Sequence, residues 1–438
     1  MKIRRWKREL AVSLVVVSAI CLFAGCGGGS GSGSNQGPAG RFVYTETNAA
    51  TAGGNAIQAY SQDSVTGKLT LLGSYATGGM GTSEPALLPT GVLDTDRAVI
   101  ANSSRTLLYA VNQGSDTIAV MRINSDGSLT PIAGSPFASG GHAPVSLGFS
   151  RNETVLTVVN SSLDPGRNVS DIAPNYTNFT VASSGSLSPV AGSTITLTAG
   201  AAATAFGSAP SIALPSPDGT LIFGSNFLGD RIPVFQVGAN GSLTQSPGSP
   251  FVPDASIFTG AAAGKPQHPF GVVALPSSTK RVLYVSYPLA QQLAVYNYDS
   301  SGTLTFVKAV SNQGKAACWL LTNAAGTRLY STNAVSGDVS VYDISDPLSP
   351  TQIQLLPLTN QAGAGLFTGN PWHEALDPTG AYLYILTPRD LGSTPSGQGN
   401  TMHVLKIDAT TGMATEVAGS LVNLNVPLGT NPQGLLAL

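Results

Sequence analysis

Three of the four histidines in the chain share a local context suited to proton transfer. His142 in "GHAPVSLGF", His268 in "KPQHPFGVVAL" and His373 in "NPWHEAL" each stand just before, or at the start of, an apolar segment that reads as a β-strand. Histidine is the side chain best placed to exchange a proton near neutral pH, so these residues are candidates for a general base. His403 in "TMHVLKI" lies inside an alternating strand pattern and is expected to be structural.

A short string of residues recurs along the chain, and each copy marks one of the structural units expected to position these histidines. "GSLTPIAGSPF" at 127–137 returns as "GSLTQSPGSPF" at 241–251, and a degenerate copy, "DPLSPTQIQLLPL", begins at Asp346. Shorter glycine-led relatives begin at Gly67, Gly185, Gly302 and Gly412. The copies are spaced by roughly 45 to 65 residues, a period typical of repeat folds such as propellers.

Each unit reads as four short antiparallel strands. In residues 210–251 an apolar segment reaches the turn "SPDGT" and "LIFGSN" returns. After a polar loop, the alternating "RIPVFQV" leads to the turn "GANG" and the recurring string. Asp-Gly and Asn-Gly between alternating segments mark turns, because glycine adopts positive φ at little cost. Seven counterparts of the second strand and seven of the third predict seven four-stranded sheets.

The two ends of this pattern complement each other. The fold begins on a second strand, "RFVYTET" from Arg41, and it ends on "NPQGLLAL" (431–438), which reads as a first strand. Pairing the last segment with the first sheet closes a ring and leaves no open sheet edge. We therefore predict an all-β fold, a seven-bladed β-propeller over residues 41–438, closed by the C-terminal strand joining the N-terminal blade.

Loop lengths distinguish the two faces of this propeller. The turns from first to second and from third to fourth strand are short, and we call their side the turn face. The long segments all connect at the opposite, top face: 74–96, 161–176, 196–210, 252–267, 361–370 and 388–400. Loops on a rigid scaffold often carry function, so we predict that the binding funnel is the top mouth of the central channel. The alternative is that the loops became long through neutral drift. The three histidines, at one repeat position in blades three, five and seven, are expected to converge there.

Few charged residues are placed to join the histidines. Glu46, Arg231 and Arg389 are expected near strand ends on the top face, and Glu374 directly follows His373. Successive strand residues point to opposite sides, so His373 and Glu374 cannot both face one ligand once the strand has begun. For each of these residues, a turn hydrogen bond or a surface charge is the competing interpretation. The candidate ligand-binding residues are His142, Glu46, Arg231, Glu374 and Arg389.

The N-terminus has the pattern of a bacterial export signal. Five basic residues in "MKIRRWKREL" precede the apolar run "AVSLVVVSAICLFAG", which is short for a membrane span. The ending "FAGC" resembles the lipobox of bacterial lipoproteins, which implies cleavage before Cys26 and acylation of its thiol. An ordinary cleaved signal with an incidental cysteine is the alternative. We expect a signal peptide at 1–25, a flexible Gly/Ser-rich tether at 26–40, and a lipid anchor in the cell envelope, on its periplasmic or outer-membrane face.

Composition excludes several classes of function. Without residues 1–25 the chain has 16 basic and 22 acidic residues, a net charge of −6, and no Lys/Arg cluster, so we expect no nucleic-acid partner. Removal of Cys21 and acylation of Cys26 would leave Cys318 alone, without a disulfide partner. The sequence has no His/Cys ligand cluster, EF-hand spacing, phosphate-binding glycine loop or G-x-S-x-G elbow, so we expect neither a metal nor a cofactor. We expect a monomer.

Units such as "LYAVNQGSDTIAVMRINSDGSLTPIAGSPF" resemble the seven-bladed propellers of the lactonase family, related to bacterial 6-phosphogluconolactonase and fungal muconate cycloisomerase. The resemblance covers nearly the whole chain after the signal. It implies an active-site cleft containing the histidine of a Pro-x-His motif ahead of an inner strand. His268 ("PQH") and His373 ("PWH") match this motif, and His142 matches it loosely. A phosphorylated sugar would require several Lys or Arg side chains around it, and few are expected at this mouth of the channel. A cytoplasmic role on such a sugar would also conflict with export.

The resemblance therefore implies a lactonase-like exported protein that binds a sugar lactone or related carbohydrate in the top funnel. As an enzyme it would be a carboxylic ester hydrolase with His268 or His373 as general base. Lactone opening needs one positioned base and some oxyanion stabilisation, so a sparse site suffices. A non-catalytic binding or interaction scaffold at the cell envelope is the alternative, since propellers host many unrelated roles.

Overall fold

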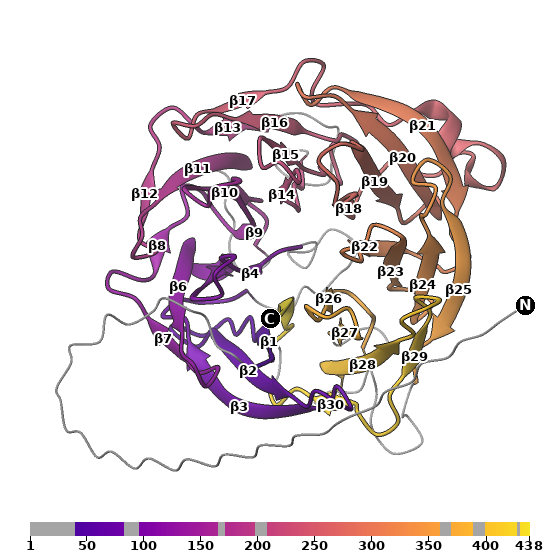
Figure 1. The fold of residues 1–438 in the computed structure, drawn as a ribbon. Helices are drawn as coiled ribbons and strands as arrows, with labels where there is room; N and C mark the ends of the chain where they lie inside the picture. The colour runs from indigo at the N-terminus through magenta and orange to yellow at the C-terminus, as the bar shows by residue number, and fades with distance from the viewer. Residues whose placement is uncertain are drawn as a thin grey trace, which may run out of the picture. The chain divides into compact units, whose positions relative to one another are not determined.

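Seven antiparallel sheets arranged around an axis account for the recurring pattern (Figure 1). A computed structural model of the protein describes residues 40–82, 96–164, 171–197, 208–359, 369–388, 399–426 and 430–438. In each sheet the first strand is innermost and the later strands follow outwards in order. The predicted all-β, seven-bladed propeller of four-stranded blades is therefore confirmed. Residues Gln36–Leu438 form one compact unit.

The strands of the first four blades have the following bounds. Blade 1 consists of β31 (Gln433–Ala437), β1 (Phe42–Glu46), β2 (Ala56–Gln62) and β3 (Leu69–Ala76). Blade 2 consists of β4 (Val99–Ala101), β5 (Leu107–Asn112), β6 (Thr117–Ile123) and β7 (Leu129–Pro131), with β8 (Phe137–Ala138) paired to β6. Blade 3 consists of β9 (Pro144–Phe149), β10 (Val155–Asn160), β11 (Asn175–Val181) and β12 (Leu187–Pro189), with β13 (Ile195–Thr196) paired to β11. Blade 4 consists of β14 (Leu214–Pro215), β15 (Leu221–Phe223), β16 (Val234–Val237) and β17 (Leu243–Gln245).

The remaining blades follow the same order. Blade 5 consists of β18 (Val272–Ala274), β19 (Val282–Tyr287), β20 (Gln292–Tyr298) and β21 (Leu304–Ser311). Blade 6 consists of β22 (Ala317–Thr322), β23 (Arg328–Asn333), β24 (Asp338–Asp343) and β25 (Thr351–Pro357). Blade 7 consists of β26 (Glu374–Leu376), β27 (Tyr382–Thr387), β28 (Thr401–Ile407) and β29 (Ala414–Glu416), with β30 (Val422–Asn423) paired to β28. Short 3-10 helices are η1 (Gln113–Ser115), η2 (Ala255–Phe258) and η3 (Gly260–Ala262). No helix among the described residues is long and apolar enough to cross a membrane.

The core consists of apolar layers between neighbouring blades. Alternate residues of a strand point to opposite faces of its sheet, and each blade packs against a neighbour on both faces. The second strands are accordingly buried along almost their whole length, as in β5, β10 and β19. One such layer joins Tyr44 and Ile57 of blade 1 to Leu108 and Ala119 of blade 2.

The C-terminal strand closes the ring as predicted. β31 pairs antiparallel with β1, bringing Ala437 opposite Val43 and Leu436 opposite Tyr44. The Phe42 N–H donates to the Leu438 carbonyl at 3.1 Å, and the Leu438 N–H donates to the Phe42 carbonyl at 2.9 Å. The last residues of the described chain thus supply the innermost strand of the first blade.

The recurring glycine that opens each string connects neighbouring blades. All six of these glycines have φ between 70° and 91°, in the left-handed region where only glycine is free of strain: Gly67, Gly127, Gly185, Gly241, Gly302 and Gly412. The Tyr44 hydroxyl donates to the Gly127 carbonyl at 3.1 Å, and Tyr384 donates to the Gly67 carbonyl at 3.1 Å. At the degenerate copy, Tyr284 donates to the Pro347 carbonyl instead, at 2.9 Å. In these blades the string is therefore a turn and an outer strand that holds its blade to the preceding one.

Candidate functional site

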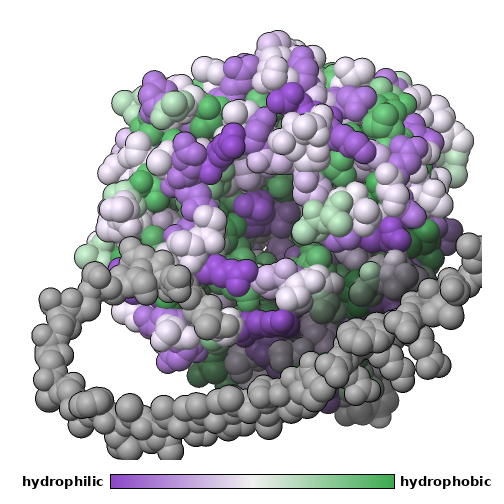
Figure 2. Space-filling view, viewed as in Figure 1, coloured by the Kyte–Doolittle hydropathy of each residue, from purple (hydrophilic) through white to green (hydrophobic). Residues whose placement is uncertain are grey.

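The starts of the first strands bring the predicted histidines to the top face. His142 precedes β9, His268 precedes β18 and His373 directly precedes β26. Figure 2 views the ring along its axis and shows a hollow at its centre with hydrophilic residues around it. Of the long top segments named from the sequence, 252–267 is fully described and contains η2 and η3, whereas parts of the others lie outside the described residues.

His268 forms an aspartate–histidine pair across two blades. Its Nδ1 lies 2.6 Å from Oδ1 of Asp230, which stands at φ 52° in the loop between β15 and β16 of blade 4. The imidazole also packs on Phe227, with ring centroids 4.4 Å apart. Among the described residues nothing hydrogen-bonds Nε2, and 21% of the side chain is exposed. A carboxylate on Nδ1 selects the tautomer in which Nε2 carries a lone pair, which is the arrangement of a general base.

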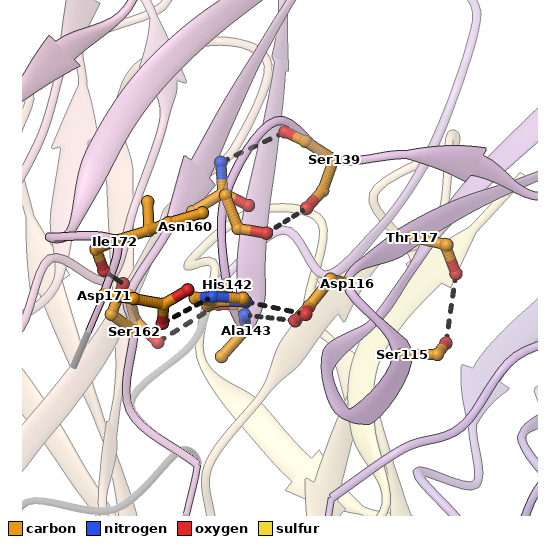
Figure 3. Close-up of polar contacts among 12 residues, drawn as sticks. Ser115, Asp116, Thr117, Ser139, His142, Ala143, Asn160, Ser162, Asp171 and Ile172 are labelled. Atoms are coloured by element: carbon orange, nitrogen blue, oxygen red, sulfur yellow. Dashed lines mark hydrogen bonds and ion pairs between the residues drawn. The ribbon is translucent and has the colours of Figure 1, made fainter. Parts of the chain in front are cut away.

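His142 is held by carboxylates on both ring nitrogens (Figure 3). Nδ1 lies 2.7 Å from Oδ2 of Asp116, and Nε2 lies 3.1 Å from Oδ1 of Asp171. The other Asp116 oxygen accepts the Ala143 N–H at 2.9 Å. Because both nitrogens face carboxylates, the imidazole has no free lone pair for a substrate. His142 therefore ties the loop of blade 2 to blade 3.

His373 is enclosed rather than presented to solvent. Its exposure is 3%, its ring stacks on Trp319 at a centroid distance of 6.1 Å, and Nδ1 has no hydrogen-bond partner within the described chain. Burial lowers the pKa of His373 to about 3. The imidazole is therefore neutral at physiological pH and accepts a proton far less readily than an exposed histidine.

Strand register corrects the expectation that the three histidines share one repeat position. His268 lies five residues before Val273, which pairs with Tyr284. His373 lies only two residues before Ala375, which pairs with the equivalent Tyr384. The carboxylate partner also differs, because blade 6 has Gly337 directly before β24 where blade 2 has Asp116 directly before β6. His268 and His373 share the local Pro-x-His motif but lie in different structural environments.

Glu46 lies buried at the end of β1. Its exposure is 0%; Asn55 Nδ2 donates to Oε1, and Gln433 Nε2 donates to Oε2 at 3.5 Å. Burial raises the pKa of Glu46 to about 8, against the opposing effect of these two hydrogen bonds. Its carboxyl group is a buried link between β1, β31 and the neighbouring loop, not an exposed ligand contact.

Glu46→Gln is expected to stabilise the protein at pH 8 but not at pH 5. The folded-state pKa of Glu46 is raised, so its ionisation weakens the fold as pH rises from the unfolded value towards about 8. The amide oxygen of the substituted glutamine can accept the hydrogen bond from Asn55. If the Gln433 side-chain amide rotates by half a turn, the new amide nitrogen can donate to Gln433 Oε1, which has no hydrogen-bond partner among the described residues. Urea unfolding should give a gain of about 1–3 kcal/mol at pH 8. An equal effect of the substitution at both pH values would contradict this assignment.

The other predicted ligand-binding residues have distinct placements. Arg231 is half-buried beside the His268 pair, and one of its terminal nitrogens donates to the Asp230 carbonyl at 2.8 Å. Glu374 opens β26 opposite Ile385; both its carboxylate oxygens are buried without a hydrogen-bond partner among the described residues. Burial, and secondarily the charge of Asp96, raises the pKa of Glu374 well above its usual range. Arg389, Cys26, residues 1–25 and all of the tether except Gly40 lie outside the described residues.

Four charged residues near the candidate site residues were not predicted from the sequence. Asp116 and Asp230 orient the histidines, and the available signal was an aspartate just ahead of a third strand in "GSDTIAV" and "GDRIPV". Asp96 and Arg97 precede β4 in "TDRAVI"; burial raises the pKa of Asp96 to about 6, although Arg97 opposes the shift. Arg97 Nε donates to the Leu147 carbonyl at 3.1 Å. Within the described ranges, no group of three or more His, Cys, Asp or Glu residues is arranged to hold a metal ion.

Comparison with known proteins agrees with the fold and with the repeats. Residues 272–393 match the family model described as Lactonase, 7-bladed beta-propeller. No curated protein sequence matches the chain. A putative 6-phosphogluconolactonase from Bacteroides uniformis superposes with a TM-score of 0.66 at 17% identity, over 91% of this chain and 99% of its own.

Two further solved structures have the same fold. A putative 6-phosphogluconolactonase from Bacteroides fragilis has a TM-score of 0.65 at 15% identity, covering 91% of this chain and 98% of its own. The periplasmic gluconolactonase PpgL of Pseudomonas aeruginosa has a TM-score of 0.64 at 16% identity, covering 89% and 99%. The resemblance inferred from the repeats is thereby confirmed: residues 272–393 match the lactonase family model, and about nine-tenths of the chain has the fold of these solved structures, so this protein is a seven-bladed β-propeller with similarity to the lactonase family.

Proposed function

We propose that the protein hydrolyses a sugar lactone or related carbohydrate lactone in its top funnel, with His268 as general base. The observation that carries the proposal is the His268–Asp230 pair at 2.6 Å, in which Nε2 is free within the described chain and the imidazole reaches solvent. His142 lacks a free ring nitrogen and His373 is enclosed with a pKa of about 3, so neither supports the same role. The proposal therefore keeps one of the two histidines that the sequence nominated.

The chemistry requires one water molecule and no cofactor. Nε2 of His268 removes a proton from water as the oxygen attacks the lactone carbonyl, and Asp230 stabilises the resulting imidazolium through Nδ1. The tetrahedral intermediate then breaks the ring C–O bond, and the imidazolium returns its proton to the departing alkoxide. The product is a hydroxy acid. The Arg231 guanidinium, beside the pair, is the candidate group to stabilise the oxyanion.

The test is hydrolysis of a panel of γ- and δ-lactones of sugars. The rate is measured at constant pH as the amount of base that must be added to neutralise the acid formed. The chain lacking residues 1–26 retains all described residues and serves as the enzyme. Opening of at least one sugar lactone above the spontaneous rate is expected. If no lactone is opened, the alternative of a non-catalytic envelope scaffold is favoured.

We further propose that the protein is exported and anchored to the bacterial cell envelope through Cys26. Support comes from the basic and apolar leader, the "FAGC" ending and the glycine- and serine-rich segment that follows it. The similarly folded gluconolactonase of Pseudomonas aeruginosa is described as periplasmic. Cys26→Ala is expected to move the protein from the membrane fraction and abolish its labelling by radioactive palmitate. Retention of the label would contradict acylation at Cys26.

A further inference from the structure

The residues directly ahead of β4 lie inside the ring of first strands. The Asp96 N–H donates at 3.2 Å to the carbonyl of Ser211, which precedes β14 of blade 4. The Leu147 N–H of blade 3 donates to the Arg97 carbonyl, also at 3.2 Å. First strands surround the central channel, so a segment that leads into blade 2 and bonds to blades 3 and 4 lies at this channel (Figure 1). Because Leu147 is in the middle of β9, Arg97 stands at mid-height.

Arg97 presents its guanidinium without a counter-ion. Nε donates to the Leu147 carbonyl at 3.1 Å. The two terminal nitrogens have no hydrogen-bond partner among the described residues and are not fully buried, so solvent reaches them. The Arg97 backbone stands at φ 63°, a conformation that costs energy for a residue with a side chain and that is concentrated at functional sites.

The Asp96 carboxylate lies near this guanidinium but forms no ion pair with it. Its Oδ1 accepts the Arg97 backbone N–H at 2.8 Å, and within the described chain no carboxylate oxygen lies within ion-pair distance of Arg97. Burial lowers the pKa of Arg97, and the charge of Asp96 opposes this shift. A partly desolvated cation is costly unless it is paired, so the unpaired guanidinium marks a candidate binding site.

The carboxyl group of Glu374 does not neutralise Arg97. Both its oxygens are buried without a partner among the described residues. Burial, and then the charge of Asp96, raises the pKa of Glu374 well above its usual range, so this group resists ionisation near neutral pH. Burial also raises the pKa of Asp96, to about 6, against the charge of Arg97. Asp96 is therefore the carboxylate whose charge opposes an anion at Arg97.

The free donors of Arg97 favour a carboxylate. With Nε occupied by the Leu147 carbonyl, the two terminal nitrogens present parallel N–H groups that match the two oxygens of one carboxylate. A single negative charge suits the site better than the double charge of phosphate, because Asp96 repels each added charge. The hollow along the axis of the ring lies inside the same circle of first strands (Figure 2).

We propose that Arg97 binds the carboxylate of a small organic acid in the central channel, and that Asp96 restricts the site to singly charged ligands. The site uses neither His268 nor Asp230. It is independent of lactone hydrolysis, so a chain without lactonase activity would still be expected to bind the acid.

Calorimetric titration at constant ionic strength with propionate, propionamide and inorganic phosphate tests this preference. Propionamide has nearly the shape of propionate without its charge. Propionate is expected to bind at least about tenfold more tightly than propionamide, which corresponds to about 1.4 kcal/mol, and more tightly than phosphate. Equal affinity for propionate and propionamide, tighter binding of phosphate, or no saturable binding of propionate would overturn the proposal.

Variants at positions 96 and 97 separate ligand binding from a structural role. Arg97→Gln keeps a donor for the Leu147 carbonyl and should weaken propionate at least about tenfold. Asp96→Asn keeps an acceptor for the Arg97 N–H but removes the opposing charge, so propionate should bind at least about twofold more tightly at pH 7.5. Arg151→Gln, the same change at an exposed arginine in the turn after β9, is the matched control and should bind propionate as the unmodified chain does.

Unfolding temperatures of the same variants complete the test. A lower unfolding temperature in Arg97→Gln with unchanged propionate affinity would show that Arg97 merely links blades 2 and 3, and would overturn the proposal. Asp96→Asn retains Arg97, so unchanged or weaker propionate binding in this variant would also overturn the proposal, even where Arg97→Gln fails to fold.

Discussion

His268→Ala is expected to lower kcat/KM for lactone hydrolysis by about 10²- to 10⁴-fold, the range typical of a lost general base. The loss should fall mainly on kcat, because the imidazole acts on the attacking water and contributes little to binding of the intact lactone. Steady-state kinetics on the best lactone of the panel measure both constants. Lys68→Ala, which replaces an exposed side chain on the turn face, is the matched control and should leave both constants unchanged.

Asp230→Asn tests the positioning of the imidazole in the same assay. An amide at this position can donate to Nδ1, which favours the tautomer whose Nε2 carries the proton and cannot act as a base. Activity is therefore expected to fall between that of the unmodified protein and that of His268→Ala, with the activity–pH profile displaced. A folding role alone would leave the profile in place. A greater loss of kcat in His373→Ala than in His268→Ala would contradict the choice of His268.

Removing residues 431–438 is expected to abolish cooperative folding. The truncation deletes β31, the innermost strand of blade 1, and leaves β1 with an unpaired edge at the channel. It also removes Leu438 and Leu436 from the layer between blades 1 and 2, and Leu435 from the layer between blades 7 and 1. Losing these three partly or fully buried leucines costs roughly 3–6 kcal/mol, a large share of the 5–15 kcal/mol that typically stabilises a domain.

Circular dichroism on heating measures this effect. The chain ending at Thr430 should show a broad, early transition or precipitate, whereas a chain that starts at Gln36 and keeps its C-terminus should melt sharply. A truncated chain that melts within a few degrees of the intact one would show that closure by β31 is dispensable.

The candidate site was only partly predictable from the sequence. The Pro-x-His motif located His268 correctly ahead of an inner strand, but it could not separate His268 from His373. Their difference depends on Asp230, which stands 38 positions earlier in another blade, and on the stacking of His373 against Trp319 of blade 6. Such partners come together only when blades pack, and no local pattern encodes that contact.

The same limit applies to Glu374. It appears in the sequence as one charged residue near a strand, consistent with a surface charge or a turn contact. The burial of its carboxylate oxygens becomes visible only in the folded chain, because a shift of one residue moves a side chain to the other face of its sheet.

The sequence by itself determined the number of blades, the order of their strands and the closure of the ring. Those features rest on local chemistry: glycine at positive φ in the turns, alternation of apolar residues along strands, and a first strand left for the end of the chain. The tertiary structure alone decided which histidine keeps a free nitrogen and which carboxylates are buried. Burial and pairing are properties of neighbours distant in sequence, and they set the proton affinity and accessibility on which chemistry depends.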